Sequence, residues 1–373
     1  MMFLNEERKV KVVIAIDSFK GCMTSVEANG AAAEGIRGVC PDAEMVQVPV
    51  SDGGEGFLEA FHAAIGGQMQ EVMVRDPLMR PITAKYLLRG DEAVIEIAQA
   101  SGLTLLTPEE RNPMVATSYG TGQLVADAIR HGAKHIIVGL GGSATSDVGI
   151  GMLRALIESL PPAPSKRGGV HGWDDVTGIK DVTFTIATDV KNPLCGENGA
   201  ANVFGPQKCN PQLSDEKKRA IIRQLDERAW KFAEVSAKHF GYDRSEMAGA
   251  GAAGGLGYAF LQYMDAECRP GIELLLNTIH FSEIVKNADL VITGEGSADR
   301  QTLMGKLPMG IRKQSGGAPV CLIAGKISDK EQLLLAGFAR VECINPPDIS
   351  LEEAMRKEVA IQHIKDTVSR LLV

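Results

Sequence analysis

The fold class follows from a stretch in which an apolar, β-branched run precedes small and charged residues, Val12-Val13-Ile14-Ala15-Ile16-Asp17-Ser18-Phe19-Lys20-Gly21. Four later stretches repeat this pattern, with apolar runs at residues 136–140, 184–187, 290–292 and 320–324. Apolar runs of this length without alternation are typical of strands buried on both faces, as in parallel α/β sheets. We therefore predict an α/β fold.

The length of the chain predicts two domains, because 373 residues exceed the size at which one hydrophobic core usually keeps growing. Strand-like runs occur near both ends and in the middle, and no long linker separates them. We therefore expect a discontinuous Rossmann- or flavodoxin-like domain with a parallel sheet, formed by residues 1–100 and 285–373. Residues 101–284 would form a second α/β domain inserted into it.

Composition and charge exclude several classes of function. The chain has 39 basic and 47 acidic residues and a net charge of −8, without a run rich in lysine and arginine, which argues against nucleic acid as a partner. No apolar stretch approaches the roughly 20 residues that span a bilayer. The seven cysteines show no paired spacing. We expect a cytoplasmic protein with a small-molecule substrate and no membrane contact, and we leave open whether it forms a homodimer.

Two glycine-rich stretches are candidates for binding a nucleotide. Residues 139–144 follow a strand-like run and fit G-x-G-x-x-A, whose small residues let backbone amides approach a phosphate. Residues 249–257 could turn successive amides toward an anion. Close packing of the backbone is the alternative explanation for both stretches. The first stretch also raises the alternative of an NAD-dependent hydroxy-acid dehydrogenase.

Carboxylates and lysines gather where strand-like runs end, which is where ligands bind in parallel α/β sheets. Asp17 and Lys20 follow the first run, while Asp52 and Glu55 lie on a glycine-rich turn. Such carboxylates could hold Mg²⁺ or the hydroxyls of a small polar substrate, and a lysine could neutralise a phosphoryl group. Asp189 follows another run and is our candidate general base. A surface ion pair and a solvated turn are the simpler interpretations of the first two groups.

A further cluster follows the run at 290–292 and combines glycines, acids and a lysine: Gly294, Glu295, Gly296, Asp299 and Lys306. A helix N-cap could explain Asp299 alone. It does not explain the other residues, so we expect the cluster to have a functional role.

Eight stretches, taken in order, resemble the type 1 glycerate kinase family of bacteria: residues 17–21, 52–56, 117–122, 141–145, 189–194, 204–208, 249–257 and 294–306. The resemblance runs from about residue 12 to residue 347. It implies phosphoryl transfer from ATP, with Mg²⁺, to D-glycerate, with 2-phosphoglycerate as the product. It also implies two α/β domains with the active-site cleft between them.

For such a phosphotransferase we assign four sets of site residues. The catalytic residues would be Asp189, Lys20 and Asp299. The substrate would contact Asp17, Ser18, Asp52, Glu55 and Lys306. The nucleotide would contact Gly141, Gly142, Ser143, Thr145, Gly251, Gly254, Gly255, Gly294 and Gly296. Mg²⁺ would be held by Asp52 and Glu295. Ser297-Ala298 replaces an Arg-Ile pair of the family, which raises the alternative of a catalytically weakened nucleotide- or metabolite-binding homologue.

Overall fold

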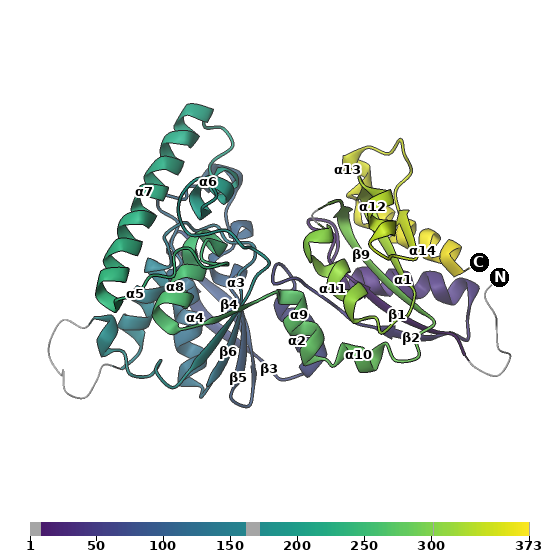
Figure 1. Cartoon of the computed structure of the whole chain (residues 1–373), viewed down its shortest axis with the longest axis horizontal. Coiled ribbons are helices and arrows are strands. Elements are labelled where there is room, and N and C mark those ends of the chain that lie inside the picture. The colour runs from purple at the N-terminus through teal and green to yellow at the C-terminus, as the bar shows by residue number, and fades with distance from the viewer. Residues whose placement is uncertain (1–8, 162–171, 301, 373) are drawn as a thin grey trace. The chain divides into compact units, whose positions relative to one another are not determined.

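The computed structural model describes residues 9–161, 172–300 and 302–372. The chain divides into two compact units. Unit 1 comprises Met1–Asp52, Glu59–Ile65 and Ile272–Val373, and unit 2 comprises Gly53–Leu58 and Gly66–Gly271. Each unit contains its own sheet (Figure 1).

Unit 1 is built on a five-stranded sheet in which every neighbouring pair is parallel. Its strands are β1 (Lys11–Ile16), β2 (Glu44–Gln47), β9 (Leu290–Ala298), β10 (Val320–Ile327) and β11 (Arg340–Cys343). The order β11-β10-β9-β1-β2 is the flavodoxin-like order 2-1-3-4-5 when strands are counted within the unit. This confirms the prediction of a flavodoxin-like parallel sheet.

The helices of unit 1 come mostly from the C-terminal part of the chain. They are α1 (Ser25–Val39), α9 (Gly271–Thr278), α10 (Phe281–Ile284), α11 (Leu307–Gln314), α12 (Lys330–Leu335), α13 (Leu351–Ala354) and α14 (Lys357–Leu372), with the 3₁₀ turn η7 (Thr302–Met304). A capping box starts α1, in which Thr24 and Glu27 bond to each other's backbone N–H. A Cβ atom on Gly35 of α1 would lie 2.6 Å from the Lys365 carbonyl oxygen of α14. The first and last helices of the chain therefore share one tightly packed core.

Unit 2 contains a six-stranded mixed sheet with the order β3-β4-β5-β6-β7-β8. Its strands are β3 (Gln68–Arg75), β4 (Pro81–Arg89), β5 (Glu92–Glu96), β6 (His135–Gly139), β7 (Thr183–Ala187) and β8 (Glu267–Arg269). The β3–β4 and β4–β5 pairs are antiparallel, and the pairs from β5 to β8 are parallel. The second unit is therefore α/β, as predicted, with an antiparallel extension at one side of its sheet.

The helices of unit 2 are α3 (Ala98–Ser101), α4 (Tyr119–Arg130), α5 (Ile150–Ser159), α6 (Ala200–Phe204), α7 (Asp215–Phe240) and α8 (Leu256–Met264). The helix α2 (Phe57–Ile65) crosses the boundary between the units. Short 3₁₀ turns are η1 (Leu103–Leu105), η2 (Pro108–Glu110), η4 (Trp173–Asp175), η5 (Pro206–Lys208) and η6 (Ala252–Gly255). Within the described ranges, no helix combines the length and the apolar character needed to cross a membrane.

The boundaries of the units differ from the domain boundaries that we expected at residues 100 and 285. β3, β4 and β5 all precede residue 100, yet β5 pairs with β6 in a parallel register that places Val94 opposite Ile137. Residues 66–100 therefore belong to unit 2. At the other end, α10 lies in unit 1, so the chain returns to unit 1 at Ile272.

Candidate functional site

The carboxyl ends of β1 and β9 lie side by side where the strand order of unit 1 reverses. Ligands of open α/β sheets bind at such a switch point, just beyond the carboxyl ends of the strands. Asp17 follows β1 directly, and its backbone N–H donates to the Gly294 carbonyl oxygen at 2.9 Å. Glu295 is the next residue of β9. The structure thus brings Asp17 and Glu295 to one edge of the sheet.

The cluster expected after the run at 290–292 begins inside the strand. β10 continues to pair with β9 as far as Ala298, with Lys326 opposite Ser297. Gly294, Glu295 and Gly296 therefore lie within β9. Sheet hydrogen bonds hold the first three residues of the cluster, and Thr302 of the η7 turn holds the backbone of Asp299.

Asp17 has a strongly perturbed carboxyl group. The residue is 8% exposed, and its Oδ1 accepts the Ser18 N–H at 2.7 Å. Burial raises the pKa of Asp17 most, the charge of Asp52 and, less strongly, that of Glu295 raise it as well, and the Ser18 hydrogen bond and the Lys20 charge lower it; the net result is a pKa of about 8. A carboxyl group in this setting can bind a proton or a cation near neutral pH.

Glu295 is held by a residue that the sequence analysis did not identify. Thr302 is fully buried, donates its hydroxyl to Glu295 Oε1 at 2.6 Å and accepts the Asp299 backbone N–H at 3.0 Å. Burial raises the pKa of Glu295, whereas the Thr302 hydrogen bond and the Lys306 charge lower it, and Asp299 raises it again. The three-residue spacing from Asp299 to Thr302 is the sequence signal that could have revealed this turn.

The two predicted lysines of unit 1 occupy different settings. Lys20 is exposed on the turn that follows β1, and its charge acts on Asp17. Lys306 is the N-cap residue of α11, where a positive charge is unfavourable because the N-terminal end of a helix is itself positive. A nearby negative group is needed to explain that position, and Glu295, whose pKa Lys306 lowers, is one such group.

The carboxylates of unit 1 fit a Mg²⁺ site of the kind that a protein shares with its substrate. Among the residues that the structure describes, no three His, Cys, Asp or Glu side chains form a ready-made metal site. Mg²⁺ is usually held by one or two carboxylates together with substrate phosphates and water. The negative charges of Asp52 and Glu295, which raise the pKa of Asp17, would be offset by such a cation. Glu55, the expected neighbour of Asp52, is exposed and belongs to unit 2.

In unit 2, the first glycine-rich stretch lies at the carboxyl end of β6. The Gly141 N–H donates to the Gly53 carbonyl oxygen at 2.9 Å. A Cβ atom on Gly141 would lie 2.2 Å from Gly54 Cα, so close backbone packing alone requires glycine at this position. Gly142 is exposed and has a φ of +72°.

The G-x-G-x-x-A stretch does not lead directly into a helix. The Ser143 hydroxyl lies 3.0 Å from Thr145 Oγ1 and accepts the Thr145 N–H at 3.0 Å. α5 begins only after a further loop, in which Asp147 accepts the N–H groups of Gly149 and Gly151 at 3.2 and 3.1 Å. A dinucleotide fingerprint requires the glycine turn itself to open the helix. The geometry therefore gives the dehydrogenase alternative no support.

The second glycine tract packs against the same loop. Gly254 has a φ of +67°, and a Cβ atom on it would lie 2.0 Å from the Thr145 carbonyl oxygen. Gly251 and Gly255 approach neighbouring backbone in a similar way. Close packing thus accounts for these glycines, and their contact with a nucleotide stays a prediction.

Asp189, the candidate general base, is partly buried two residues beyond the carboxyl end of β7. Its negative charge adds to the effect of burial in raising the pKa of the Cys268 thiol. Asp189 therefore lies at the edge of the unit 2 sheet where ligands are expected. Its catalytic role stays a prediction.

Lys208 is a buried cation to which the sequence analysis assigned no role. It is 3% exposed, and its Nζ donates to the Thr145 carbonyl oxygen at 2.6 Å. Burial lowers the pKa of Lys208 to about 8, and the negative charge of Asp147 opposes this effect. Since 63 positions separate Lys208 from Thr145, no local spacing could have revealed the contact.

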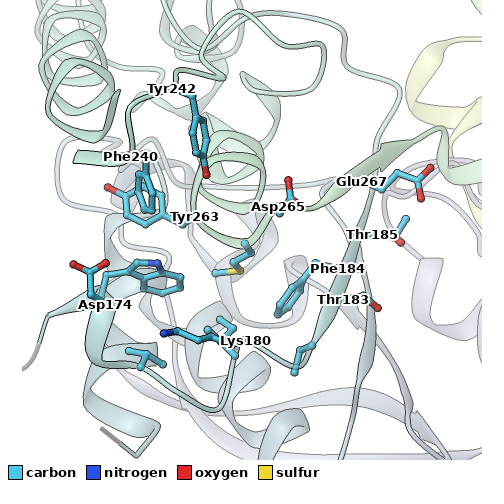
Figure 2. Close-up of a pocket in the computed structure, with 15 residues that line it drawn as sticks. Asp174, Lys180, Thr183, Phe184, Thr185, Phe240, Tyr242, Tyr263, Asp265 and Glu267 are labelled. Atoms are coloured by element: carbon cyan, nitrogen blue, oxygen red, sulfur yellow. The ribbon is translucent and has the colours of Figure 1, made fainter. Parts of the chain in front are cut away.

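Unit 2 also has a cavity of about 700 Å³ that is lined by none of the predicted site residues. It lies at the amino-terminal ends of β7 and β8, and Figure 2 shows aromatic side chains along it, including Phe240, Tyr242 and Tyr263. Two of its carboxylates already have partners: Asp265 forms an ion pair with Arg244, and Asp174 lies 3.1 Å from the Nε2 atom of His239. Because ligands of α/β sheets bind at the opposite edge, this cavity is not our candidate site.

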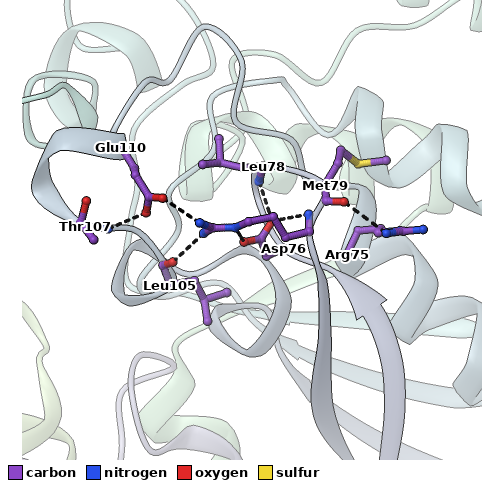
Figure 3. Close-up of polar contacts among 8 residues, drawn as sticks. Arg75, Asp76, Leu78, Met79, Leu105, Thr107 and Glu110 are labelled. Carbon is purple, nitrogen blue, oxygen red and sulfur yellow. Dashed lines mark hydrogen bonds and ion pairs between the residues drawn. The ribbon is translucent and has the colours of Figure 1, made fainter.

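A polar cluster at the β3–β4 turn has a structural role (Figure 3). Asp76 is 2% exposed, and its Oδ1 accepts the N–H groups of Leu78 and Arg80, both at 2.8 Å. The Arg80 guanidinium donates to Asp76 at 2.5 Å and to Glu110 at 2.7 Å. One guanidinium thus bonds both carboxylates, and the backbone N–H groups satisfy the buried one, so the cluster fixes the turn without requiring a ligand.

The chain matches known proteins along most of its length. A family model described as the glycerate kinase family matches residues 12–373. A glycerate kinase from Halalkalibacterium halodurans is 42% identical over 362 residues, which cover 93% of each chain. A glycerate 2-kinase from Escherichia coli is 41% identical over 335 residues, which cover 86% of each chain.

A crystal structure from Salmonella typhimurium, of a protein assigned as a glycerate kinase 2, matches with a TM-score of 0.77 and 35% sequence identity. The match covers 98% of this chain and 97% of that one. These comparisons give no support to the dehydrogenase alternative. They confirm the resemblance noted in the sequence, and the chain therefore belongs to the glycerate kinase family.

Proposed function

We propose that this enzyme transfers the γ-phosphoryl group of ATP to D-glycerate and produces 2-phosphoglycerate. Its family membership makes the chain a kinase, and relatives named glycerate kinase and glycerate 2-kinase support this substrate and this product. The observation that carries the proposal is the group of Asp17, Asp52 and Glu295 with two lysines at the switch point of unit 1. A small hydroxy acid offers hydroxyl donors and one carboxylate, which such a mixed set can bind.

In this proposal the residues of unit 1 bind the acceptor substrate and balance charge. The carboxylates of Asp17 and Asp52, with the Ser18 hydroxyl, would accept or donate hydrogen bonds to the hydroxyls of glycerate. Lys20 and Lys306 would offset negative charge on glycerate or on the phosphates. Mg²⁺ held by Asp52 and Glu295, together with phosphate oxygens, would reduce the charge of the phosphates when bound.

The residues of unit 2 would act on the nucleotide and on the transferred proton. The backbone around Gly141 and Gly142, and the tract from Gly251 to Gly255, would contact the nucleotide. Asp189 would accept the proton of the attacking glycerate hydroxyl. The hydroxyl oxygen then forms a bond to the γ-phosphorus, the bond to the bridging oxygen breaks, and ADP leaves. Positioning and charge stabilisation supply most of the catalysis in such reactions, so no covalent intermediate is needed.

The first test supplies purified protein with ATP, Mg²⁺ and D-glycerate and follows ADP release, with enolase added to detect 2-phosphoglycerate directly. ADP release with an immediate enolase signal would support the proposal. ADP release without that signal, until a phosphoglycerate mutase is added, would reassign the reaction to the 3-hydroxyl. Absence of ADP release would contradict the proposed activity and favour the alternative of a binding homologue.

A matched pair of variants connects the activity to the site. Asp52→Asn removes a carboxylate from the group at the switch point and should lower turnover at least a hundredfold. Asp42→Asn removes an exposed carboxylate from the same unit and should leave turnover unchanged. Equal effects of the two changes would contradict the placement of the substrate site.

We also propose that the protein works in the cytoplasm. The seven cysteines are all free thiols in the structure. Free thiols in this number are typical of a reducing compartment. Recovery of the protein from a secreted or periplasmic fraction would contradict this location.

A further inference from the structure

The loop at residues 143–149, between β6 and α5, is held in a strained shape. Asp147 accepts the Ser118 N–H at 2.8 Å as well as N–H groups at the start of α5, so its carboxylate ties the loop to two helices. Val148 has a φ of +58°, a left-handed conformation that is rare for a β-branched residue. Such strain persists only where the surrounding structure imposes it, and it is frequent at ligand sites.

The Thr145 carbonyl of this loop is fixed from two directions. Lys208 Nζ donates to it at 2.6 Å, and the Gly254 backbone approaches so closely that a Cβ atom there would lie 2.0 Å from the same oxygen. The hydrogen bond to the Thr145 carbonyl does not by itself explain a lysine at this buried position, because an uncharged donor could satisfy the same carbonyl without the cost of burying an ammonium group. A functional reason for the ammonium group is therefore needed.

The functional reason for the Lys208 ammonium group lies in Ser146, the residue that follows Thr145. It is 8% exposed, and within the described residues its buried Oγ has no hydrogen-bond partner. A buried hydroxyl without a partner is costly and calls for an explanation, such as a ligand. The loop follows the carboxyl end of β6, which is where a ligand of this sheet is expected. The missing partner is therefore best supplied by an oxygen acceptor of a bound anion.

We propose that Lys208 is a positioning residue that fixes the Thr145 peptide, so that the Ser146 hydroxyl donates a hydrogen bond to a phosphate oxygen of the bound nucleotide. This inference rests on the proposed function, because it takes ATP as the nucleotide. It adds to that proposal a buried lysine and a serine that act on the phosphates of ATP and not on its adenosine part. Loss of either residue should therefore weaken ATP binding selectively.

The test compares Lys208→Met, Ser146→Ala and the double variant. Each single change should raise the KM for ATP about tenfold and leave the KM for D-glycerate within twofold. Calorimetry should show the same loss for ATP binding and no change for adenosine. If Lys208 acts through Ser146, the two losses should not add. The double variant should then have the same affinity for ATP as the single variant that binds ATP less tightly.

Lys218→Met is the matched control. Lys218 also donates to a backbone carbonyl in unit 2, that of Pro211 at 3.2 Å, but it is only partly buried and this hydrogen bond is exposed to solvent. Its replacement should change neither KM. If Lys208→Met does not fold, Ser146→Ala alone still tests the contact with phosphate.

The inference would be overturned by a parallel loss of affinity for ATP, adenosine and D-glycerate in Lys208→Met, because that result describes a general structural tether. Unchanged ATP binding in Ser146→Ala would also overturn it. A failure of the proposed function is recognised separately, by wild-type protein that binds ATP more tightly than adenosine but does not phosphorylate D-glycerate. In that case the binding comparison among the variants still decides the role of Lys208.

Discussion

Replacing Asp17 by asparagine should stabilise the folded protein and remove its activity. The pKa of the buried carboxyl is about 8, against an ordinary value of 3.8, so between these values the folded state holds a proton that the unfolded state has released. The free energy of unfolding of the wild-type protein must therefore fall as the pH rises from about 4 to about 8. At about 1.36 kcal/mol per pH unit, the carboxyl costs about 4 kcal/mol of stability at pH 7.

Asparagine has nearly the same shape, carries no charge, and its amide oxygen can still accept the Ser18 N–H. Asp17→Asn should thus unfold with a free energy about 4 kcal/mol above that of the wild type at pH 7. The two proteins should become equal near pH 4, where the aspartic acid is protonated in both states. Since the same carboxyl is assigned to the substrate, phosphorylation of D-glycerate should be lost, which is the usual conflict between stability and function at a site.

The measurement is urea unfolding between pH 5 and pH 8.5, followed by circular dichroism, with EDTA present to exclude metal ions. Asp42→Asn, at an exposed position of the same unit, should stay within about 0.5 kcal/mol of the wild type at every pH. Wild-type and Asp17→Asn curves that stay parallel across this pH range would refute the reasoning. They would mean that Asp17 is already ionised in the folded protein and that burial beside Asp52 does not raise the pKa of its carboxyl group.

Three further changes test the remaining parts of the site. Asp189→Asn should lower kcat by roughly 10² to 10⁴, the usual effect of losing a general base; turnover near that of the wild type would remove Asp189 from this role. Gly141→Ala places a Cβ atom 2.2 Å from Gly54 Cα and should lower the free energy of unfolding by about 1–3 kcal/mol, whereas an unchanged urea midpoint would show that the backbone yields easily. Thr302→Val removes the 2.6 Å hydrogen bond to Glu295 and should raise the pKa of that carboxyl. The acidic limb of the pH–rate profile should then move to higher pH, while Thr302→Ser should keep the wild-type profile.

The sequence predicts the fold class well because buried parallel strands leave a direct trace. The apolar run at residues 12–16 and the runs at 290–292 and 320–324 all lie within strands of the unit 1 sheet. β3 leaves no such trace, because four of the eight residues of Gln68–Arg75 are polar and only one residue is buried. Without that strand, the antiparallel extension of unit 2 was not predicted, and the domain boundary was placed too late.

Site residues could be predicted from the sequence only where they lie in, or directly after, a strand with a clear apolar run. Asp17 and Glu295 were identified in this way, and the sheet register brings them together. Thr302 and Lys208 were not, because each acts through a partner that only the folded chain brings close. The glycines show the reverse case: a sequence rich in glycine does not distinguish a backbone that approaches a phosphate from one that approaches another backbone segment, as at Gly254.

The arrangement of unit 1 also has a consequence for how the protein is made. The Lys11 N–H in β1 donates to the carboxylate of Asp289, which is 278 positions later in the chain. At about 5–20 residues per second, the ribosome needs roughly 15 s to 1 min to supply that partner. Most of unit 2, residues 66–271, is synthesised in between and can fold first, whereas β1 and β2 wait with an unpaired apolar edge. The N-terminal strands therefore stay without their sheet partners for most of the synthesis, and an unpaired strand edge of this kind is prone to aggregation.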